Sequence, residues 1–519
     1  MIRSSSRMVV ALCAALVLAA CGGGGGTPAP SGAGGAPVPG GTARVLVYSE
    51  ARSMDPATLG NAWARHAFLG NALYGTLLID DRATRKERPM MAESFTSGDG
   101  GATFTLKLRP GLTFSDGSAL DAAAVKFNWD RQKDPASGTQ YRAEVSMIAS
   151  TAVADPTTLA VTMVEPVPNY ASVVTTSSLN WIASPAALQA GQQAFDAKPI
   201  GAGPYTLQSW VRGGAVELVR NPRYWDAPKP YLDRITVTTS SDAAQRYNSV
   251  ISGGIDVAVE SSWVNLAKAK QAGFPTDRVE LNGGQYLAMN TRRAPFDDVR
   301  ARQAVAAALD PNAANQATYR GEAQLVSTLF REGSPYYADT ALRTPDKDRA
   351  QRLFDELAAE GKPVSFTFTS FPTSESRSIA ESVQAQLAAF RNTKVEIKIV
   401  DLAETGALHA SHDFDVMISS AFFRDPDPRL YNVFHGGSDS NMAGIDDAEL
   451  NAALETGRTA TAPQDRRAAY ATVQRRLVEL MPVLFDFQAA PGAVTGKRVR
   501  GLMQYGDGSL LPEELWIQK

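Results

Sequence analysis

The chain has little cysteine, and both cysteines, Cys13 and Cys21, lie close to its start. The rest of the sequence therefore forms no internal disulfide and no thiolate metal site, and packing must supply its stability. Neither sign of charge dominates, because 51 Lys and Arg residues stand against 54 Asp and Glu residues. This balance argues against a nucleic-acid partner, which would need a basic face. No fixed repeat period is present, which excludes solenoids and propellers.

Enzyme signatures are missing as well. The chain contains no G-x-S-x-G, H-E-x-x-H or Walker A motif, and its body has no G-x-G-x-x-G. No motif therefore supports a hydrolase, metalloprotease or nucleotide-binding function, and we expect neither catalytic residues nor a cofactor. Of only four histidines, His409 and His412 are three residues apart, a spacing that would put two metal ligands on one helical face. The alternative is a solvent-facing pair on a loop-rich stretch.

The apolar run at the N-terminus is short. It extends from Met8 to Ala20 behind Arg3 and Arg7. This length is too short to cross a bilayer, but it is typical of the apolar region of a secretory signal. We therefore expect residues 1–20 to be a signal peptide that exports the protein. Residues 21–41 are dominated by Gly and Pro, a composition that predicts a flexible tether.

The end of this run, Leu18-Ala19-Ala20-Cys21, resembles the lipobox of bacterial lipoproteins. The resemblance implies that Cys21 becomes the acylated first residue and anchors the body at the periplasmic face of a membrane. A tether of this length spans about 25 Å on average, so the body would stay near the lipid surface. The alternative is a signal peptide without lipidation, in which Cys21 is incidental.

The size and patterning of the remaining chain predict a multidomain α/β protein. With 519 residues and 55.3 kDa, the chain exceeds the size at which one hydrophobic core stops growing, so at least two domains are expected. Short alternating apolar runs predict half-buried strands, and longer patterns between them predict helices, one capped by Asp121 and one stopped by Gly361. The expected strands are at 104–108, 159–163, 364–368 and 395–399, and the second helix at 346–360.

Short motifs are spread over nearly the whole chain beyond the tether. They are Ser53-Met54-Asp55-Pro56, Asn71-Ala72-Leu73-Tyr74, Pro89-Met90-Met91-Ala92-Glu93-Ser94, Phe104-Thr105-Leu106-Lys107-Leu108-Arg109, Phe114-Ser115-Asp116-Gly117, Val125-Lys126-Phe127-Asn128-Trp129, Gly201-Ala202-Gly203-Pro204-Tyr205, Arg220-Asn221-Pro222 with Tyr224-Trp225, Ser252-Gly253-Gly254-Ile255-Asp256, and Asn290 with Ala294-Pro295-Phe296-Asp297-Asp298-Val299-Arg300. In order and spacing they resemble the family-5 extracellular solute-binding proteins, which serve ABC importers for peptides, nickel and other solutes.

The resemblance implies an α/β, two-lobed periplasmic-binding-protein-like fold of type II, with an extra small subdomain and a hinge of two crossing strands. The lobes would close around a ligand. The expected boundaries are 42–78, 197–281 and 488–519 for lobe I, 79–196 for a subdomain inserted in lobe I, and 282–487 for lobe II. Gly201, Gly203 and Pro204 predict a tight crossing between lobes, and the pair Gly283-Gly284 predicts a hinge.

The implied function is that of the substrate-binding component of an ABC importer. It would capture a peptide or another small polar organic solute and deliver it to a permease in the inner membrane, as a monomer held to the bilayer through Cys21. One alternative is a nickel or metal-chelate receptor, which needs His409, His412 or His435 in the cleft. Two further alternatives, of different classes, are an envelope lipoprotein hydrolase and a chaperone.

Several residues are expected to bind the ligand, because they match positions that line the cleft in relatives. Tyr141 follows Asp134-Pro135 at the offset of a pocket tyrosine in peptide-binding members. The other candidates lie after the first motif, after the strand that ends at Val259, and at the returning crossing. They are Trp63, His66, Glu260, Trp263 and Asp486. For Trp63 and Glu260 the alternatives are core packing and an exposed loop, respectively.

A departure from the family concerns Arg424 and Asp425. Peptide-binding relatives have a G-W-x-x-D-like turn whose Asp receives the free ammonium of the peptide. Counted without gaps, Ala421 replaces the tryptophan of that turn, and Arg424 replaces its Asp. The exchange would remove the cation anchor and offer a guanidinium suited to a carboxylate or phosphate. Two alternatives stay open: Arg424 faces solvent, or a one-residue slip lets Asp425 restore the amine site.

Overall fold

Seven strands form the largest sheet of the computed structural model, which describes residues 35–82, 84, 86–401 and 404–519. All the elements described here belong to the unit 37–519. Across the sheet, the strands are β12 (Thr276–Arg278), β18 (Gly492–Thr495), β11 (Val257–Glu260), β1 (Thr42–Val47), β10 (Arg234–Thr239), β9 (Val216–Arg220) and β8 (Tyr205–Trp210). β1 is parallel to both of its neighbours, whereas the other pairs are antiparallel. The sheet therefore joins segments from both ends of the described chain.

A second, four-stranded sheet lies between β1 and β8 in the sequence. Its order is β4 (Ala92–Thr96), β5 (Thr103–Leu108), β7 (Thr158–Met163) and β6 (Ile148–Asp155). The alternating burial of β5 and β7 confirms the half-buried strands predicted at 104–108 and 159–163. Helix α2 (Ala122–Gln132) packs on this sheet through the fully buried Trp129, and Asp121 caps it as predicted. We call the seven-stranded sheet, the four-stranded sheet and their helices lobe I.

Short elements complete lobe I. The helices are α1 (Ala67–Tyr74), α3 (Arg142–Ser146), α4 (Tyr170–Thr176), α5 (Pro185–Gln189), α6 (Gln192–Ala197), α7 (Ala243–Ile251) and α8 (Trp263–Gln271). The 3₁₀ turns are η1 (Pro56–Thr58), η2 (Pro135–Ser137), η3 (Ser178–Asn180) and η5 (Pro512–Glu514). The two-stranded sheets of the described residues are β2 (Leu78–Asp80) with β3 (Glu87–Pro89), β19 (Val499–Arg500) with β22 (Trp516–Ile517), and β20 (Gln504–Tyr505) with β21 (Ser509–Leu510).

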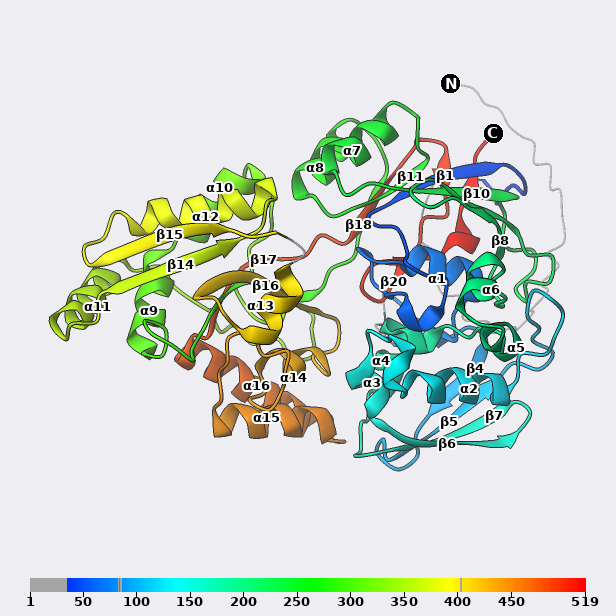
Figure 1. Ribbon diagram of the computed structural model, residues 1–519, viewed down its shortest axis with the longest axis horizontal. Helices are drawn as coiled ribbons and strands as arrows, with labels where there is room; N and C mark the ends of the chain where they lie inside the picture. The colour runs from blue at the N-terminus through cyan, green and yellow to red at the C-terminus, as the bar shows by residue number, and fades with distance from the viewer. Residues whose placement is uncertain (1–34, 83, 85, 402–403) are drawn as a thin grey trace, which may run out of the picture. The chain divides into compact units, whose positions relative to one another are not determined.

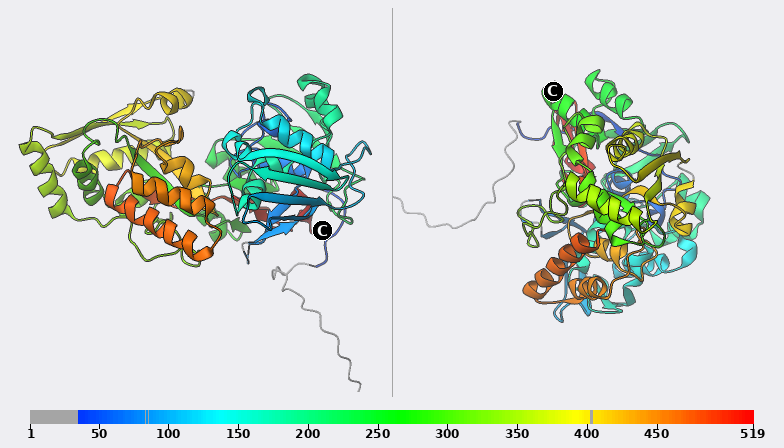
Figure 2. Two further views of the ribbon diagram at one scale, coloured as in Figure 1. Left: turned by 90° about the horizontal axis from the view of Figure 1, so that it is seen from below. Right: turned by 90° about the vertical axis from the view of Figure 1, so that its left-hand side faces the viewer.

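Lobe II is built on a five-stranded sheet. Its order is β15 (Thr393–Ile399), β14 (Val364–Ser370), β16 (Val416–Phe423), β13 (Asn282–Met289) and β17 (Val483–Phe487). Its helices are α9 (Val299–Ala308), α10 (Pro311–Tyr319), α11 (Lys347–Ala359), α12 (Ser374–Leu387), α13 (Thr405–Ser411), α14 (Arg429–Phe434), α15 (Ala448–Thr459) and α16 (Pro463–Leu480). The strands and the helix predicted in this part of the chain are confirmed by β14, β15 and α11, which ends before Gly361 at φ +77°. Figures 1 and 2 show α15 and α16 packed side by side.

Two connections join the sheets of the lobes. Residues 279–281 lead from β12 to β13, and residues 488–491 return from β17 to β18. The connections touch each other, because the Val279 N–H donates to the Pro491 carbonyl at 2.8 Å. Val279, Leu281 and Ala489 form a small buried cluster of their own at this place. A pair of short, mutually bonded connections is an arrangement that permits bending without separating the lobes.

The glycine-rich segment before β8 does not cross between lobes. The Gly203 N–H donates to the Leu73 carbonyl at 3.0 Å, and a Cβ at Gly203 would collide with the Ala72 carbonyl oxygen. The prediction that Gly201, Gly203 and Pro204 form an inter-lobe crossing is therefore wrong. These glycines are needed because the backbone lies directly against the end of α1, inside lobe I.

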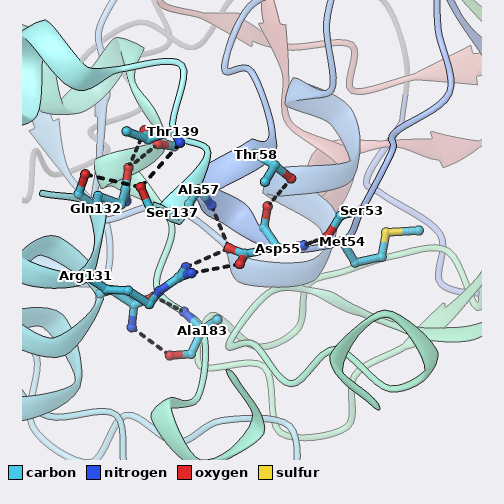
Figure 3. A network of polar contacts seen from close by, with 12 residues as sticks. Ser53, Met54, Asp55, Ala57, Thr58, Arg131, Gln132, Ser137, Thr139 and Ala183 are labelled. Atoms are coloured by element: carbon cyan, nitrogen blue, oxygen red, sulfur yellow. Dashed lines mark hydrogen bonds and ion pairs between the residues drawn. The ribbon is translucent and has the colours of Figure 1, made fainter. Parts of the chain in front are cut away.

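An ion pair ties the start of lobe I to the four-stranded sheet. Asp55 caps η1 by accepting the Ala57 N–H at 2.9 Å, and its two oxygens accept from Arg131 of α2 at 2.6 and 2.8 Å. Figure 3 shows this fork, with the Arg131 guanidinium aimed at both oxygens of Asp55. Asp55 is buried, and such a bidentate pair is geometrically specific. The network therefore fixes the chain that leads from η1 to the loop at residues 61–65.

Candidate functional site

A cavity of about 370 Å³ lies between residues of the two lobes. One wall is the loop at residues 61–65 of lobe I, together with Tyr141 and Asp507. The opposite wall is the end of β16 and the turn after it, at residues 422–425 of lobe II. The lining mixes aromatic rings with charged side chains, which suits a small polar ligand that must be oriented as well as enclosed.

A smaller cavity of about 120 Å³ continues the first. The two share Ser172, Thr176, Arg424 and Asp425 in their lining, so they are parts of one cleft. The lining of the smaller part includes Asp80 at the end of β2 and Glu87 at the start of β3, both in lobe I, and Asn282 at the start of β13 in lobe II. Taken together, the volumes fall in the lower part of the range for small-molecule sites.

Tyr141 and Trp63 project into the cleft from lobe I. Tyr141 precedes α3, and its hydroxyl oxygen accepts the Asn61 N–H at 2.6 Å. This hydrogen bond holds Tyr141 against the loop at residues 61–65. Burial raises the pKa of the Tyr141 phenol, so it stays protonated at neutral pH. Trp63 packs edge to face on Tyr48, with ring centroids 5.3 Å apart. Aromatic side chains held in this way offer apolar faces with one polar atom each.

Asp425 of lobe II lies in the cleft wall but already has a partner. Its two oxygens accept from Arg466 of α16 at 2.5 and 2.9 Å. Arg466 is 6% exposed, and its guanidinium also lies 5.4 Å from the ring centre of Tyr470. The charge on Asp425 is therefore neutralised inside the protein.

Arg424, the neighbouring residue, pairs across the cleft. Its guanidinium forms an ion pair with Asp80 of β2, in lobe I, and Asp80 also accepts the Gly506 N–H. The Arg424 side chain is 16% exposed and that of Asp80 is 7% exposed, so the pair is largely shielded from solvent. Of the alternatives predicted for Arg424, the structure thus places the side chain in the cleft rather than in solvent.

Asp507 and Glu144 contribute carboxylates to the same cleft without an ion pair in the described part of the chain. Burial raises the pKa of the Asp507 carboxyl to about 6, against the opposing effect of Arg424 and Arg429. Burial also raises the pKa of Glu144. Arg65 and Arg429 line the cleft as well, and neither forms an ion pair with a described residue. The cleft therefore retains unmatched charges of both signs.

Four of the predicted site residues line neither cavity. Glu260 is 1% exposed and pairs with Arg246 at 3.0 Å. Asp486, the last residue but one of the buried strand β17, forms an ion pair with Arg343. The other two make local contacts in lobe I: the Trp263 indole N–H donates to the Gln488 carbonyl at 3.1 Å, and His66 Nδ1 accepts the Gly60 N–H at 3.3 Å.

Of the histidines whose side chains the structure describes, neither His412 nor His435 lines either cavity. His435 contacts Glu455 at 3.1 Å and stacks on Tyr431. His412 follows α13 in the left-handed region, at φ +53°, so it is not on a helical face with His409, whose side chain lies outside the described part. Over residues 35–82, 84, 86–401 and 404–519, no cluster of three or more His, Cys, Asp or Glu side chains is placed to hold a metal ion.

Sequence reasoning missed Asn61, Asp507 and Arg429 as cleft residues. Asn61 is held from far along the chain, because its amide oxygen accepts from the hydroxyls of Ser509 at 2.9 Å and Tyr505 at 3.3 Å. No local pattern reports a contact between positions 448 residues apart. Asp507 had one usable signal: it stands between Gly506 and Gly508, a sequence typical of a tight turn that presents its central side chain.

The two α/β lobes and the cleft between them form the two-lobed fold of periplasmic binding proteins, and comparison with known structures agrees. The periplasmic binding protein AgaA from A. tumefaciens R10, in complex with agropinic acid, superposes with a TM-score of 0.79 at 24% identity, covering 92% of this chain and 99% of that one. NikA from Brucella suis, in complex with Fe(III)-EDTA, superposes with a TM-score of 0.78 at 23% identity, covering 92% and 100%. The predicted fold class is confirmed.

Residues 86–441 match the family described as "Bacterial extracellular solute-binding proteins, family 5 Middle", and the chain belongs to this family. The glutathione-binding protein GsiB of Escherichia coli (strain K12) is 28% identical over 375 residues, which cover 70% of this chain and 70% of that protein. The predictions of an ABC-importer solute-binding protein, rather than an enzyme, and of a periplasmic or extracellular location are confirmed at this level. Cys21 lies outside the described residues, and none of the described helices has the length and apolar character to cross a membrane.

Proposed function

We propose that the protein captures a peptide or a similar small polar organic solute in the cleft and delivers it to an ABC permease. The observation that carries this proposal is the cleft lining, which combines Trp63 and Tyr141 with unmatched charges of both signs. Apolar faces bind the body of a ligand, and fixed charges orient its ends. The 28% identity to a glutathione-binding protein supports a ligand of this chemistry.

In this proposal the ligand contacts Trp63, Tyr141, Arg424 and Asp425, which all line the cleft. In this proposal Arg424 and Asp425 contribute hydrogen-bonding surface rather than free charge, because Asp80 and Arg466 neutralise them. The other four expected residues, Glu260, Trp263, Asp486 and His66, support the lobes from behind the cleft. Lobe II spans 282–487 and moves about the connections at 279–281 and 488–491.

The test is isothermal titration calorimetry with three peptides: glutathione, the dipeptide Met-Leu and trialanine. At least one should bind, and the Trp63→Ala variant should weaken its binding by about ten-fold, since the indole supplies apolar contact area. Native mass spectrometry of the protein as purified gives a second readout, because a co-purified solute adds its mass to the complex. Absence of binding by all three peptides, with no co-purified peptide, would refute the proposal.

We further propose that Cys21 is lipidated and anchors the protein, as a monomer, to a membrane at the periplasmic face. The support is the run Leu18-Ala19-Ala20-Cys21 and the Gly-rich segment that follows it. Several acyl chains hold a protein on a bilayer stably, whereas one holds it only marginally. The variant Cys21→Ser should move the protein from the membrane fraction to a soluble or uncleaved form. Unchanged membrane fractionation would contradict the anchor.

A further inference from the structure

Asp507 presents its carboxylate to the cleft from the last segment of lobe I. It lies in the turn between β20 and β21, which the Gly508 N–H closes on the Tyr505 carbonyl at 3.0 Å. Gly508 packs so closely that a Cβ there would lie 2.7 Å from Pro491 and 3.1 Å from the Cβ of Trp63. This turn is therefore fixed against the aromatic wall of the cleft, and the direction of its central side chain is fixed with it.

The other aspartates of the cleft lining have cationic partners. Asp425 pairs with Arg466, and Asp427 pairs with Arg458 at 2.9 Å. Asp507 differs from them, because no side chain of the described residues forms a hydrogen bond or an ion pair with it. Asp507 is half-buried in the cleft wall, so its carboxylate is partly withdrawn from water and has no partner in the described protein; a ligand that supplies a donor would compensate for the lost hydration.

We propose that Asp507 receives a primary ammonium group of the ligand, and that Asp425 does not. The inference rests on the proposed capture of a peptide-like solute. It states that the protein recognises the ammonium end of that solute. An ammonium group has three donors, and its charge-assisted hydrogen bonds to a carboxylate are about twice as strong as neutral ones. The same role at Asp425 would require the ammonium to compete with a bidentate guanidinium that is already in place.

The surroundings of Asp507 fit a ligand that carries charges of both signs. Tyr141 and Glu144 line the same cavity, and both Asp507 and Glu144 act electrostatically on the Tyr141 phenol. Arg65 and Arg429 line this cavity too: Arg65 acts electrostatically on the Tyr141 phenol, and Arg429 acts on Asp507 and Glu144. Neither cation forms an ion pair with a described residue, so both are available to a carboxylate of the same ligand. The chemical class is thus an amino-acid-derived zwitterion with a free amine.

The experiment compares probes that carry a free amine with the same probes in amine-blocked form. Calorimetry is run with glutathione, Met-Leu and trialanine, each also in its N-acetylated form, on the full mature chain. We expect the wild type to bind the free form of its preferred probe at least ten-fold more tightly than the acetylated form. In Asp507→Asn this ratio should fall below about three-fold, because the amide keeps the shape and removes the charge.

Two control variants isolate the effect. Asp439→Asn makes the same change at an exposed position outside both cavity linings, and Asp425→Asn makes it at the paired aspartate of the cleft. Asp439→Asn should leave the binding of every probe unchanged. Asp425→Asn changes a ligand contact and should weaken the free and acetylated forms alike, so only the ratio between them, which should stay at least ten-fold, is read from this variant. Asp507→Ser serves as a second neutral variant at the proposed position. Melting temperatures check folding, and failure of both Asp507 variants to fold would overturn the inference, since an unpaired carboxylate is not needed for stability.

The outcomes separate the two proposals. If the wild type binds a free peptide and its acetylated form equally, or if Asp507→Asn keeps the ten-fold preference, the role of Asp507 is wrong while peptide capture stands. Loss of the preference in Asp425→Asn alone would also overturn it and assign the ammonium to lobe II. If the wild type binds none of the six probes, the proposed function fails, and the inference falls with it.

Discussion

Glu260 shows why a polar residue at a predicted site position can serve the fold instead of the ligand. Its carboxylate accepts the Arg246 guanidinium at 3.0 Å and the N–H groups of Ser261 and Ser262 at 2.9 Å each. Asn265 adds a fourth donor at 3.0 Å. The side chains of the ion pair are 1% and 2% exposed. Four donors inside lobe I thus hold the carboxylate, three at Oε1 and one at Oε2, and its burial keeps it away from a solute.

Replacing Glu260 by Gln should destabilise the protein strongly. The amide keeps the shape of the side chain but leaves the Arg246 charge buried without compensation, and breaking a buried pair in this way costs about 3–5 kcal/mol. Urea denaturation followed by circular dichroism measures the change. Glu381→Gln, at an exposed position in α12, is the matched control and should change stability by less than about 0.5 kcal/mol. A loss below about 1 kcal/mol for Glu260→Gln would contradict the assignment.

Stability should fall as the pH rises from 5 to 7. Burial raises the pKa of Glu513 to about 7 and that of Asp507 to about 6, both above the values near 4 of unfolded chains. The folded state therefore binds these protons more tightly than the unfolded state. The stability they contribute is complete below about pH 4 and is lost as the pH rises through 6 and 7.

Thermal melting at pH 5, 6 and 7 measures this dependence. Glu513 is 2% exposed, and one of its oxygens has no hydrogen-bond partner among the described atoms. Glu513→Gln should therefore flatten the profile between pH 6 and 7. Burial lowers the pKa of His66, whose contribution has the opposite sign, so the difference between wild type and variant is the informative quantity. Parallel profiles for the two proteins would be inconsistent with a titrating Glu513.

At the scale of single elements, Gly283 and Gly284 do more than supply a bend at the start of β13. Gly283 has φ +65°, and a Cβ there would collide with the Ala421 carbonyl oxygen of β16. A Cβ at Gly284 would lie 2.6 Å from the Phe487 carbonyl oxygen of β17. β13 is the strand between these two neighbours in the sheet. The pair thus permits three backbones to meet closely where lobe II begins.

The variant Gly284→Ala should lose stability and disturb the start of β13. The added methyl group must push Phe487 or Val326 away, and overpacking of this kind costs about 1–3 kcal/mol. Gly361→Ala, also in lobe II, is the comparison variant. A Cβ at Gly361 meets no atom within 4 Å, but the residue has positive φ, so this variant measures the cost of backbone strain without overpacking. Hydrogen exchange at the amides of β13 and β17 gives the local readout. Unchanged exchange at Tyr286 and Leu287 would show that the strand tolerates the methyl group.

Elements with a clear period were predictable, and contacts between distant segments were not. β5, β7, β14 and β15 alternate apolar and polar residues because a pleated strand shows alternate side chains to the core. The inter-lobe crossing predicted from the glycines before β8 was wrong, because these glycines lie against the end of α1, a contact that the local sequence does not show. The same limit applies to the site: the turn with Asp507 reaches the loop at Asn61 only in the folded chain.

For the whole molecule, the Arg424–Asp80 ion pair is a bridge between lobes. Arg424 follows β16 of lobe II, and Asp80 ends β2 of lobe I. Both side chains are largely shielded, so their attraction is screened less than that of a surface pair. An ion pair that forms only when the lobes approach stabilises the closed arrangement relative to an open one. Its loss should therefore shift the ligand-free protein toward open forms.

Small-angle X-ray scattering of the ligand-free protein tests this bridge. Arg424→Ala should give a larger radius of gyration than the wild type, because the lobes separate about the connections at 279–281 and 488–491 when the pair is lost. Arg391→Ala breaks an exposed pair with Asp355 inside lobe II and should leave the scattering unchanged. Adding a saturating peptide should return Arg424→Ala to the smaller radius, since a ligand held by both walls favours closure. Superimposable curves for Arg424→Ala and the wild type without ligand would mean that the pair does not hold the lobes together.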